Sequence, residues 1–279
     1  MFDTQSIEEV HDILIAGIKK FFNSCNCSTA VLGLSGGIDS AVVAALATEA
    51  LGKENVFGIL MPSQFSTLHS INDSVNLANN LGMSYNIIPI EKIYNRFLKE
   101  ITPLFNGDNH WDNTQENLQA RIRGTILMSY SNRHKALLMN TSNKSELSMG
   151  YGTLYGDLAG AIMVIADIYK LQVYELANYY NRDEEIIPIS TITKAPSAEL
   201  REDQKDSDSL PAYEVLDPIL YKLNEGGLSS EQLLNEDIDK DVLNKILRLC
   251  SAATFKRGQM APVIKVSSKP LLEKSKWIE

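Results

Sequence analysis

A glycine-rich turn followed by a carboxylate is the part of this sequence whose residue types most directly suggest chemistry. The segment VLGLSGGIDSAVVAALATEALG, from Val31 to Gly52, places Ser-Gly-Gly between an apolar run and a predicted helix. Glycines let a ligand approach the backbone closely, and the first turn of a helix offers unpaired N–H groups and the positive end of the helix dipole. The turn therefore predicts an anion site that suits a pyrophosphate, with Ser35 and Ser40 as additional hydroxyl donors.

Asp39 lies at the start of this helix, where a carboxylate would repel bound phosphates unless a cation lay between them. A bound Mg²⁺ explains the residue, because this ion prefers hard oxygen ligands and binds phosphates together with one or two carboxylates. The segment alone leaves a second interpretation open, in which Asp39 is a first-turn acid favoured by the helix dipole. The pattern is neither a Walker A sequence, which needs Lys-Ser/Thr after its last glycine, nor G-x-G-x-x-G.

Segments typical of strands and helices alternate around the turn. The predicted strands cover 29–34, 55–62, 84–90 and 135–142, and the predicted helices between them cover 38–51, 66–82, 91–101 and 114–134. This alternation indicates the α/β class, with a doubly wound, mainly parallel sheet and helices on both faces. Ligands of such sheets bind beyond the carboxyl ends of the strands, where the Ser-Gly-Gly turn is predicted to lie.

The chain on either side of this alternation is predicted to be helical or irregular. An amphipathic helix with apolar residues from Ile7 to Phe21 precedes the first strand, and another helix is expected at 169–182. A segment rich in proline and charge follows, and a helical part at roughly 229–254 gives way to extended chain. We expect one domain over 1–279, divided into a nucleotide-binding core at about 29–190 and a lid segment with a C-terminal helical extension at about 191–279.

Composition argues against several classes of function. The chain has 279 residues and a formal net charge of -9, whereas nucleic-acid binders usually carry a basic patch. No apolar run approaches the ~20 residues of a membrane span, and the N-terminus lacks the features of a signal peptide. The 3 cysteines and 4 histidines show neither zinc-ligand spacing nor a disulfide framework. We therefore expect a cytoplasmic protein without nucleic-acid or membrane partners.

Five motifs carry a resemblance to a known family. SGGIDS resembles the pyrophosphate loop of the N-type ATP pyrophosphatases, which cleave ATP between its α and β phosphates. Four further motifs resemble those of NAD synthetases: NLQARIRGTILM (117–128), NTSNKSELSMGYGTLYGDLAG (140–160), APSAELREDQKDSDSLPAYEVLDPIL (195–220) and FKRGQMAPVIKVSSK (255–269). They are most similar to the synthetase part of glutamine-dependent NAD synthetases. The resemblance implies a Rossmann-like fold of the adenine nucleotide alpha hydrolase type.

The resemblance implies ATP-dependent amidation of deamido-NAD (nicotinic acid adenine dinucleotide), with Mg²⁺ as cofactor. ATP adenylates the carboxylate, pyrophosphate leaves, and ammonia attacks the acyl-adenylate to give NAD and AMP. No protein nucleophile is needed, so the chain has to hold two anions in line and neutralise the charge on the leaving pyrophosphate. Because the chain begins at the synthetase part, we expect an enzyme that uses free ammonia or is fed by a separate amidase.

The resemblance also implies roles for individual residues. Asp39 and Glu146 correspond to the two acidic Mg²⁺ ligands, and with Lys170 they would stabilise the transition state. The residues that correspond to ATP contacts are Gly33, Leu34, Ser35, Gly36, Gly37, Ile38, Asp39, Ser40, Thr141, Lys170 and Ser197. Those that correspond to deamido-NAD contacts are Asn117, Arg121, Asp157 and Lys256. Simpler interpretations stay open, namely a solvated helix face for Asn117 and Arg121 and a helix-start acid for Glu146.

Two positions depart from the small ammonia-dependent synthetases. Leu154 and Ala161 occupy places where those enzymes have Lys and Asp, so we assign neither residue to the nicotinate end of the substrate. The glutamine-dependent branch shares the TLYGD sequence, which makes this a difference between branches.

Two further expectations concern a lid and a dimer. The charged run 201–209 is expected to be a lid that orders over the adenylate and excludes water. The family implies a homodimer, and the apolar stripe of the first helix and the 114–134 helix are the candidate surfaces. The stripe of the first helix fits ordinary core packing equally well.

Two other functions remain as alternatives. Another N-type ATP pyrophosphatase would amidate a different carboxylate or thiolate a nucleoside, and a tRNA-modifying member should show a basic face or a cysteine constellation, which this sequence lacks. A non-catalytic nucleotide-binding module would keep the glycine loop but lose the magnesium carboxylates, and both Asp39 and Glu146 are present.

Overall fold

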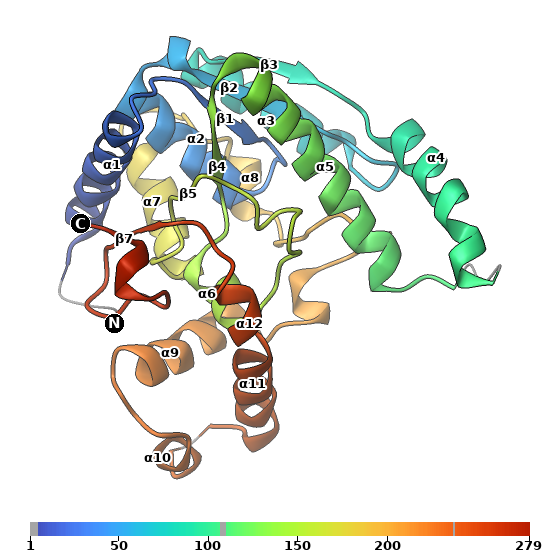
Figure 1. The fold of residues 1–279 in the computed structure, drawn as a ribbon. Helices are drawn as coiled ribbons and strands as arrows, with labels where there is room; N and C mark the ends of the chain where they lie inside the picture. The colour runs from blue at the N-terminus through green and yellow to red at the C-terminus, as the bar shows by residue number, and fades with distance from the viewer. Residues whose placement is uncertain (1–4, 107–109, 237) are drawn as a thin grey trace.

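The computed structural model describes residues 5–106, 110–236 and 238–279, with a sheet at the centre of the fold (Figure 1). Within these residues the sheet has seven strands, all parallel, in the order β3-β2-β1-β4-β5-β6-β7. The strands are β1 (Ala30–Gly33), β2 (Val56–Leu60), β3 (Ser84–Ile87), β4 (Leu137–Asn140), β5 (Ile162–Met163), β6 (Val263–Ile264) and β7 (Trp277–Ile278). The strand order reverses between β1 and β4, which is the point at which doubly wound sheets bind ligands.

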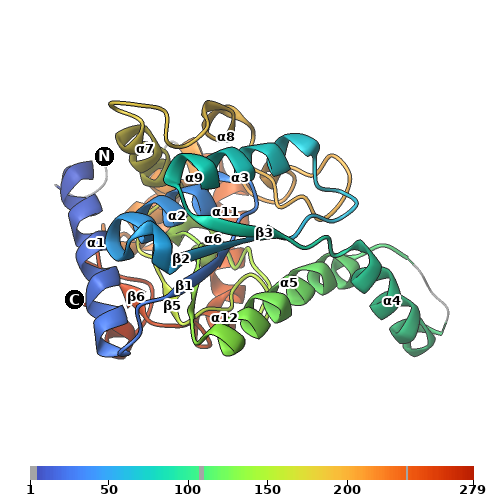
Figure 2. The ribbon, with the colours of Figure 1, turned by 90° about the horizontal axis from the view of Figure 1, so that it is seen from above.

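Helices cover both faces of the sheet (Figure 2). One face carries α1 (Ile7–Ser24), α2 (Ile38–Leu51), α3 (Leu68–Leu81) and α7 (Lys170–Tyr180), and the other carries α4 (Glu91–Ile101) and α5 (Asn113–His134). The predicted α/β class with a doubly wound parallel sheet is confirmed. Strand β2 ends at Leu60, before Pro62, whereas the prediction extends it through this proline, which has no N–H for the ladder.

The apolar stripe of α1 belongs to the core. Leu14 and Ile18 are fully buried in a cluster that also contains residues of α2, α7 and β6. Gly17 lies so close to β6 that an added Cβ would be 2.5 Å from Cγ2 of Ile264. The stripe is therefore not a free surface for a second copy of the chain, and this corrects one of the two candidate dimer surfaces.

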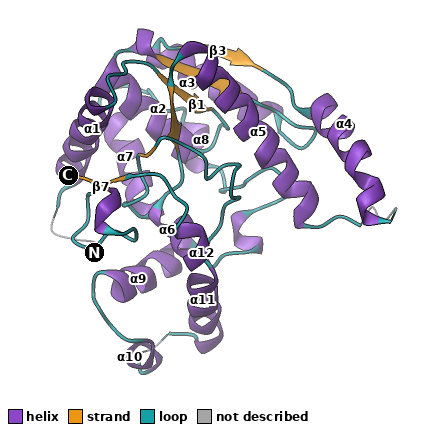
Figure 3. Ribbon diagram, in the orientation of Figure 1, coloured by secondary structure: helices purple, strands orange, loops and turns teal. Residues whose placement is uncertain are grey.

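A second group of helices projects from one end of the sheet, as Figure 3 shows. It consists of α9 (Tyr213–Asn224), α10 (Ser230–Leu234) and α11 (Lys240–Ala252). The part at roughly 229–254 that was predicted to be helical contains α10 and α11, which are separate helices. The Asp239 carboxylate accepts the N–H groups of Asp241 and Val242 at 2.9 and 3.0 Å and starts the second of them.

The sequence pattern misses α9 because Pro218 lies inside it. Proline removes one helical hydrogen bond, but Leu216, Ile219 and Leu220 are buried in a shared apolar cluster with α11, and this burial outweighs the loss. The shorter elements are α6 (Lys144–Met149), α8 (Ile189–Thr193), α12 (Thr254–Arg257), and the 3₁₀ helices η1 (Lys53–Asn55), η2 (Thr102–Phe105), η3 (Asp206–Asp208) and η4 (Lys274–Lys276).

Strands β5, β6 and β7 are also absent from the sequence prediction. Each has only two residues, which is too short for an alternating or apolar pattern to be recognised. Across the described parts of the chain, no helix combines the length and the apolar character needed to cross a membrane.

Leu14→Ala is expected to lower the free energy of unfolding by about 2–5 kcal/mol, because it removes a fully buried side chain and leaves a cavity in the core. Denaturant unfolding of the purified protein measures this loss. The matched control is Leu68→Ala, whose side chain is 78% exposed and whose loss should change stability by no more than about 0.5 kcal/mol. Equal effects of the two substitutions would show that α1 does not pack as described.

Candidate active site

The predicted anion loop connects β1 to α2. The hydroxyl of Ser35 accepts the N–H of Gly37 at 3.2 Å and lies 3.1 Å from the hydroxyl of Ser40, which donates to the carbonyl of Gly37 at 2.9 Å. Gly36 has a φ of +78°, and an added Cβ would lie 2.4 Å from the carbonyl oxygen of Ser70. This position therefore requires glycine, and the loop is a preformed turn at the N-terminus of a helix.

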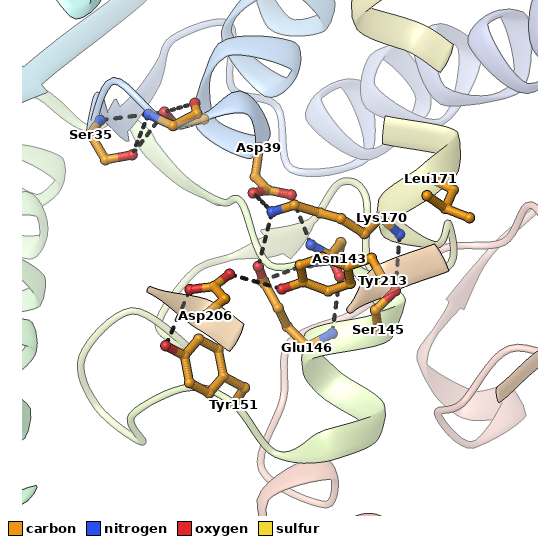
Figure 4. A network of polar contacts seen from close by, with 12 residues as sticks. Ser35, Asp39, Asn143, Ser145, Glu146, Tyr151, Lys170, Leu171, Asp206 and Tyr213 are labelled. Atoms are coloured by element: carbon orange, nitrogen blue, oxygen red, sulfur yellow. Dashed lines mark hydrogen bonds and ion pairs between the residues drawn. The ribbon is translucent and has the colours of Figure 1, made fainter. Parts of the chain in front are cut away.

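A cluster of charged residues lies beside the loop (Figure 4). The ammonium Nζ of Lys170 is 2.5 Å from Oδ2 of Asp39 and 3.5 Å from Oε1 of Glu146. Asn143, which caps α6, donates its side-chain amide to Oδ1 of Asp39 at 2.8 Å. Helices α2, α6 and α7 thus bring together the two predicted magnesium ligands and the predicted phosphate-contacting lysine.

Burial and charge change the acidity of this cluster. Burial, reinforced by the Asp39 carboxylate, raises the pKa of Glu146 to about 8, although the Lys170 ammonium opposes the change. For Lys170, burial favours the neutral amine, but the attraction of Asp39 and Glu146 outweighs it and raises the pKa. Burial also raises the pKa of the nearby Asp206 carboxyl. The site concentrates acidic groups around one ammonium, and a second cation would favour their ionised forms.

A buried carboxylate positions the start of α7. Asp217 on α9 accepts the Ser145 hydroxyl at 2.6 Å and the N–H of Leu171 at 2.9 Å. The Ser145 hydroxyl in turn accepts the N–H of Lys170 at 2.9 Å. These bonds satisfy two unpaired N–H groups at the start of α7 and hold the backbone of Lys170 in place.

Asp206 lies beside the cluster, near Glu146, as Figure 4 shows. Its carboxylate accepts the hydroxyls of Tyr213 at 2.9 Å and Tyr151 at 3.2 Å, and the Tyr213 ring centroid is 5.2 Å from the Lys170 ammonium. Asp206 belongs to the run 201–209, which the sequence interprets only as a lid. The structure places one buried side chain of that run in the site.

Lys144, which directly follows the cap of α6, is fully buried. Its ammonium pairs with Asp167 at 2.9 Å, forms a second ion pair with Glu225, and donates to the hydroxyl of Ser267 at 2.8 Å. The Ser267 hydroxyl also donates to Asp167 at 2.8 Å. This network fixes α6, and with it Glu146, to both α9 and the C-terminal segment.

A cavity of about 310 Å³ opens at the carboxyl ends of β1, β2 and β4. The predicted ATP contacts that line it are Gly33, Leu34, Ser35, Gly37, Ile38, Asp39, Ser40, Thr141, Lys170 and Ser197. Gly36 is not part of the lining and packs against the backbone of α3 instead. Glu146 and Asp157 complete the predicted residues that face this cavity.

Three of the predicted deamido-NAD contacts do not line the cavity. Asn117 and Arg121 on α5 bind the loop 150–157. The side-chain amide oxygen of Asn117 accepts a threonine hydroxyl of the loop at 2.7 Å, and the Arg121 Nε donates to a loop carbonyl at 3.3 Å. The Lys256 ammonium donates to two carbonyls of the same loop at 2.7 and 2.8 Å. Only Asp157 of this group reaches the cavity, so the structure separates the other three from the ATP contacts.

Leu154 and Ala161 have structural roles here. Leu154 packs against an apolar cluster that includes Leu158, and the N–H of Ala161 donates to the carbonyl of Leu138 at 2.7 Å. Neither side chain offers a hydrogen-bond donor or acceptor for a nicotinate carboxylate.

Sequence reasoning missed several residues that line the cavity, including Arg123, Tyr151, Lys194 and Asp206. Lys194 precedes Ser197 by three residues, and its ammonium donates to the Ser70 hydroxyl at 3.0 Å. The positive charges of Arg123, within the motif 117–128, and of Lys194, directly before the motif 195–220, were available signals. Nothing local distinguishes Asp206 from its charged neighbours.

The fold and the site together define a class of protein. A doubly wound parallel sheet with a glycine-rich anion loop at the switch point is a nucleotide-binding α/β protein. The model of the NAD synthase family matches residues 10–260, and the chain belongs to this family. NAD synthases are ligases that form a carbon–nitrogen bond, and the membership confirms the resemblance carried by the motifs.

Individual relatives agree with this assignment. A glutamine-dependent NAD(+) synthetase from Synechocystis sp. is 49% identical over 96% of this chain, and one from Thermotoga maritima is 44% identical over 94%. The chain covers 48% and 46% of these proteins, so it spans about half the length of the curated relatives it matches.

Solved structures that cover the same length are also similar. An NH3-dependent NAD synthetase from Campylobacter jejuni has 32% identity and a TM-score of 0.73, over 94% of this chain and 100% of its own. An NMN synthetase from Francisella tularensis has 27% identity and a TM-score of 0.78, over 96% of this chain and 100% of its own.

The stability of the protein is expected to fall, relative to that of Asp217→Asn, as the pH rises from about 4 to 7. Burial raises the pKa of Asp217 to about 6, above its ordinary value of 3.8, so the folded state binds a proton that the unfolded state releases. Unfolding therefore releases a proton in this range and becomes more favourable at higher pH. Denaturant unfolding at several pH values measures the difference, with Asp183→Asn, at an 85% exposed side chain, as the control. A constant difference between wild type and Asp217→Asn would contradict the burial of this carboxylate.

Proposed function

We propose that the chain catalyses the ATP-dependent amidation of deamido-NAD with ammonia, giving NAD, AMP and pyrophosphate. The observation that carries this proposal is one cavity in which the anion loop, the Asp39–Lys170–Glu146 cluster and Asp157 face one another. The relatives are NAD synthetases, which supports NAD as the product, and the NH3-dependent relative of matching length supports ammonia as a nitrogen donor.

The anion loop suits the phosphates of ATP. The N-terminus of α2 and the hydroxyl of Ser35 would supply donors, and both line the cavity. Ser40 also lines the cavity, and its hydroxyl holds the turn by donating to the Gly37 carbonyl. Lys170 lies at the far side of Asp39, where its ammonium would neutralise charge on the departing pyrophosphate. The adenylated carboxylate would then lie in the cavity between Lys170 and Asp157.

Asp39 and Glu146 are a donor set that fits Mg²⁺, which takes one or two carboxylates together with substrate phosphates and water. Within the described parts of the chain, no group of three or more His, Cys, Asp or Glu could hold a metal ion by itself. The Asp39 carboxylate adds to burial in raising the pKa of Glu146, and a cation bound between the two carboxylates would relieve this repulsion. When bound, the ion would supply charge neutralisation for the phosphates.

The chain's own residues would orient the reactants and exclude water. The two nucleophiles, the carboxylate and then ammonia, come from the substrates, and no side chain has to form a covalent bond. The Ser145–Asp217 bonds hold Lys170 in position, and Asn143 holds Asp39. We propose that these fixed positions reduce the reorganisation needed when charge develops on the leaving group.

We propose the run 201–209 as the lid of the site. Arg201 pairs with Asp208 at 2.7 Å and with Glu116 of α5 at 3.4 Å, and Asp206 reaches the charge cluster. The run thus links α5 to the cluster across the cavity. Closed in this way, it would protect an acyl-adenylate from hydrolysis.

A second candidate substrate is the corresponding mononucleotide, nicotinic acid mononucleotide. The structure of an NMN synthetase matches 96% of this chain, so the same fold is compatible with a shorter substrate. Amidation would follow the same steps, and the two candidates differ only in whether the chain binds a second nucleotide half.

We also propose two partners. The exposed apolar side chains of Ile93, Phe97 and Leu104 on α4 and η2, and that of Met128 on α5, are candidate contacts for a second copy of the chain. A separate amidase that supplies ammonia is the other proposed partner, because the curated relatives are glutamine-dependent NAD synthetases.

NAD should form from deamido-NAD, ATP and Mg²⁺ when ammonium is the nitrogen donor, with one pyrophosphate released per NAD. Asp39→Asn is expected to lower kcat by about 10²–10³-fold, because it removes a charge that the transition state depends on. Coupled measurements of NAD and pyrophosphate test both statements. Parallel reactions with nicotinic acid mononucleotide compare the two candidate substrates.

Asp183→Asn, on the exposed surface, is the matched control for the loss of a carboxylate. Activity with ammonium but not with glutamine would support a chain that uses ammonia directly. Pyrophosphate release without any amide product, from either substrate, would overturn the proposed function.

ATP and Mg²⁺ together should slow proteolytic cleavage after Arg201 and Lys205, because closure of the 201–209 run would order the chain around them. Mass spectrometry of trypsin digests with and without the nucleotide measures the rate at each site. Cleavage at lysines of the exposed helix α4 is the internal control and should not change. Equal rates at Arg201 in both conditions would show that the run is not a lid.

A further inference from the structure

Arg123 lies on the wall of the cavity, on a face of α5 different from the one that carries Arg121. The residues of α5 that line the cavity are Ala120, Arg123, Gly124 and Leu127, which share one face at helical spacing. Arg121 is exposed and binds the loop 150–157 instead. The two arginines of the ARIR sequence therefore serve two different surfaces, and only Arg123 faces the space proposed for ATP.

One hydrogen bond holds the Arg123 guanidinium. Its Nε donates to the carbonyl of Met61, immediately after β2, at 3.0 Å. Among the residues that the structure describes, no acceptor bonds the two terminal nitrogens and no carboxylate forms an ion pair with them. The bond to Met61 thus orients the guanidinium, and its two terminal nitrogens remain available to donate hydrogen bonds to a ligand.

Two carboxylates, those of Asp157 and Glu199, influence the pKa of Arg123, but both accept hydrogen bonds from other groups. Asp157 accepts the N–H of Thr153 at 2.7 Å, and Glu199 accepts the hydroxyl of Ser70 at 2.6 Å. Both favour the charged guanidinium from a distance, yet burial is the larger influence and lowers the pKa of Arg123 to about 10. A cation in such surroundings lacks a direct anionic partner, and a ligand oxyanion would supply one.

We propose that Arg123 binds an oxyanion of one of the two nucleotide substrates, through the paired donors of its guanidinium. Planar, forked donors match the oxygens of a phosphate or a carboxylate, and such bonds are charge-assisted. The oxyanion is either a phosphate of ATP or the nicotinate carboxylate that ATP adenylates. This inference rests on the proposed function for the identity of the two substrates.

The test compares Arg123→Lys and Arg123→Met with the wild type in calorimetric titrations of ATP with Mg²⁺ and, separately, of deamido-NAD. The dissociation constant of one substrate should rise by about 10- to 100-fold, because a charge-assisted hydrogen bond to an otherwise unpaired group is lost. A rise for ATP alone assigns the phosphate, and a rise for deamido-NAD alone assigns the carboxylate. Arg123→Lys keeps the charge without the fork, so it should recover only part of the affinity.

Arg133→Met is the matched control, since Arg133 is exposed near the end of the same helix. Added guanidinium ion should restore part of the affinity of Arg123→Met, which a merely structural role would not predict. Unchanged affinity for both substrates in either folded variant would overturn the inference. A wild-type protein that binds neither substrate would instead overturn the proposed function, so the two failures are distinguishable.

Discussion

The Lys170 ammonium is the charge on which the arrangement of the site depends. It lies between Asp39 and Glu146, two carboxylates that would otherwise repel each other across a largely buried space. Coulomb attraction in such surroundings is much stronger than in water, but each ion also loses hydration, so the cluster is stable only if its geometry is well fixed. The surrounding hydrogen bonds supply that geometry.

Two members of the cluster are held by partners from distant parts of the chain. Asn143 orients Asp39, and Asp217 orients the backbone of Lys170 through Ser145. The cluster thus draws together α2, α6, α7 and α9, which come from both the nucleotide-binding core and the C-terminal helices. A site built on rigid elements in this way keeps its donors aligned without a ligand.

The sequence was most informative where structure is determined locally. The SGGIDS turn and the alternating elements through residue 142 could be predicted, because glycines, caps and apolar periodicity act within a few residues. Helix α9 could not be predicted, because burial against distant residues outweighs the effect of Pro218. The role of Asp206 could not be predicted either, because contacts with distant residues distinguish it from the other acids of its charged run. The motifs indicated Asn117 and Arg121, but only the folded structure shows that they lie apart from the cavity.

The Lys144 network has a consequence for how the protein is made. The bond between Lys144 and Ser267 spans 123 positions of the chain, and both side chains are buried. Because synthesis proceeds from the N-terminus, the residues of the anion loop leave the ribosome long before Ser267 does. The base of α6 therefore lacks one of its partners while the next 123 positions are synthesised, and the Lys144 network that supports the site is complete only after Ser267 has been added.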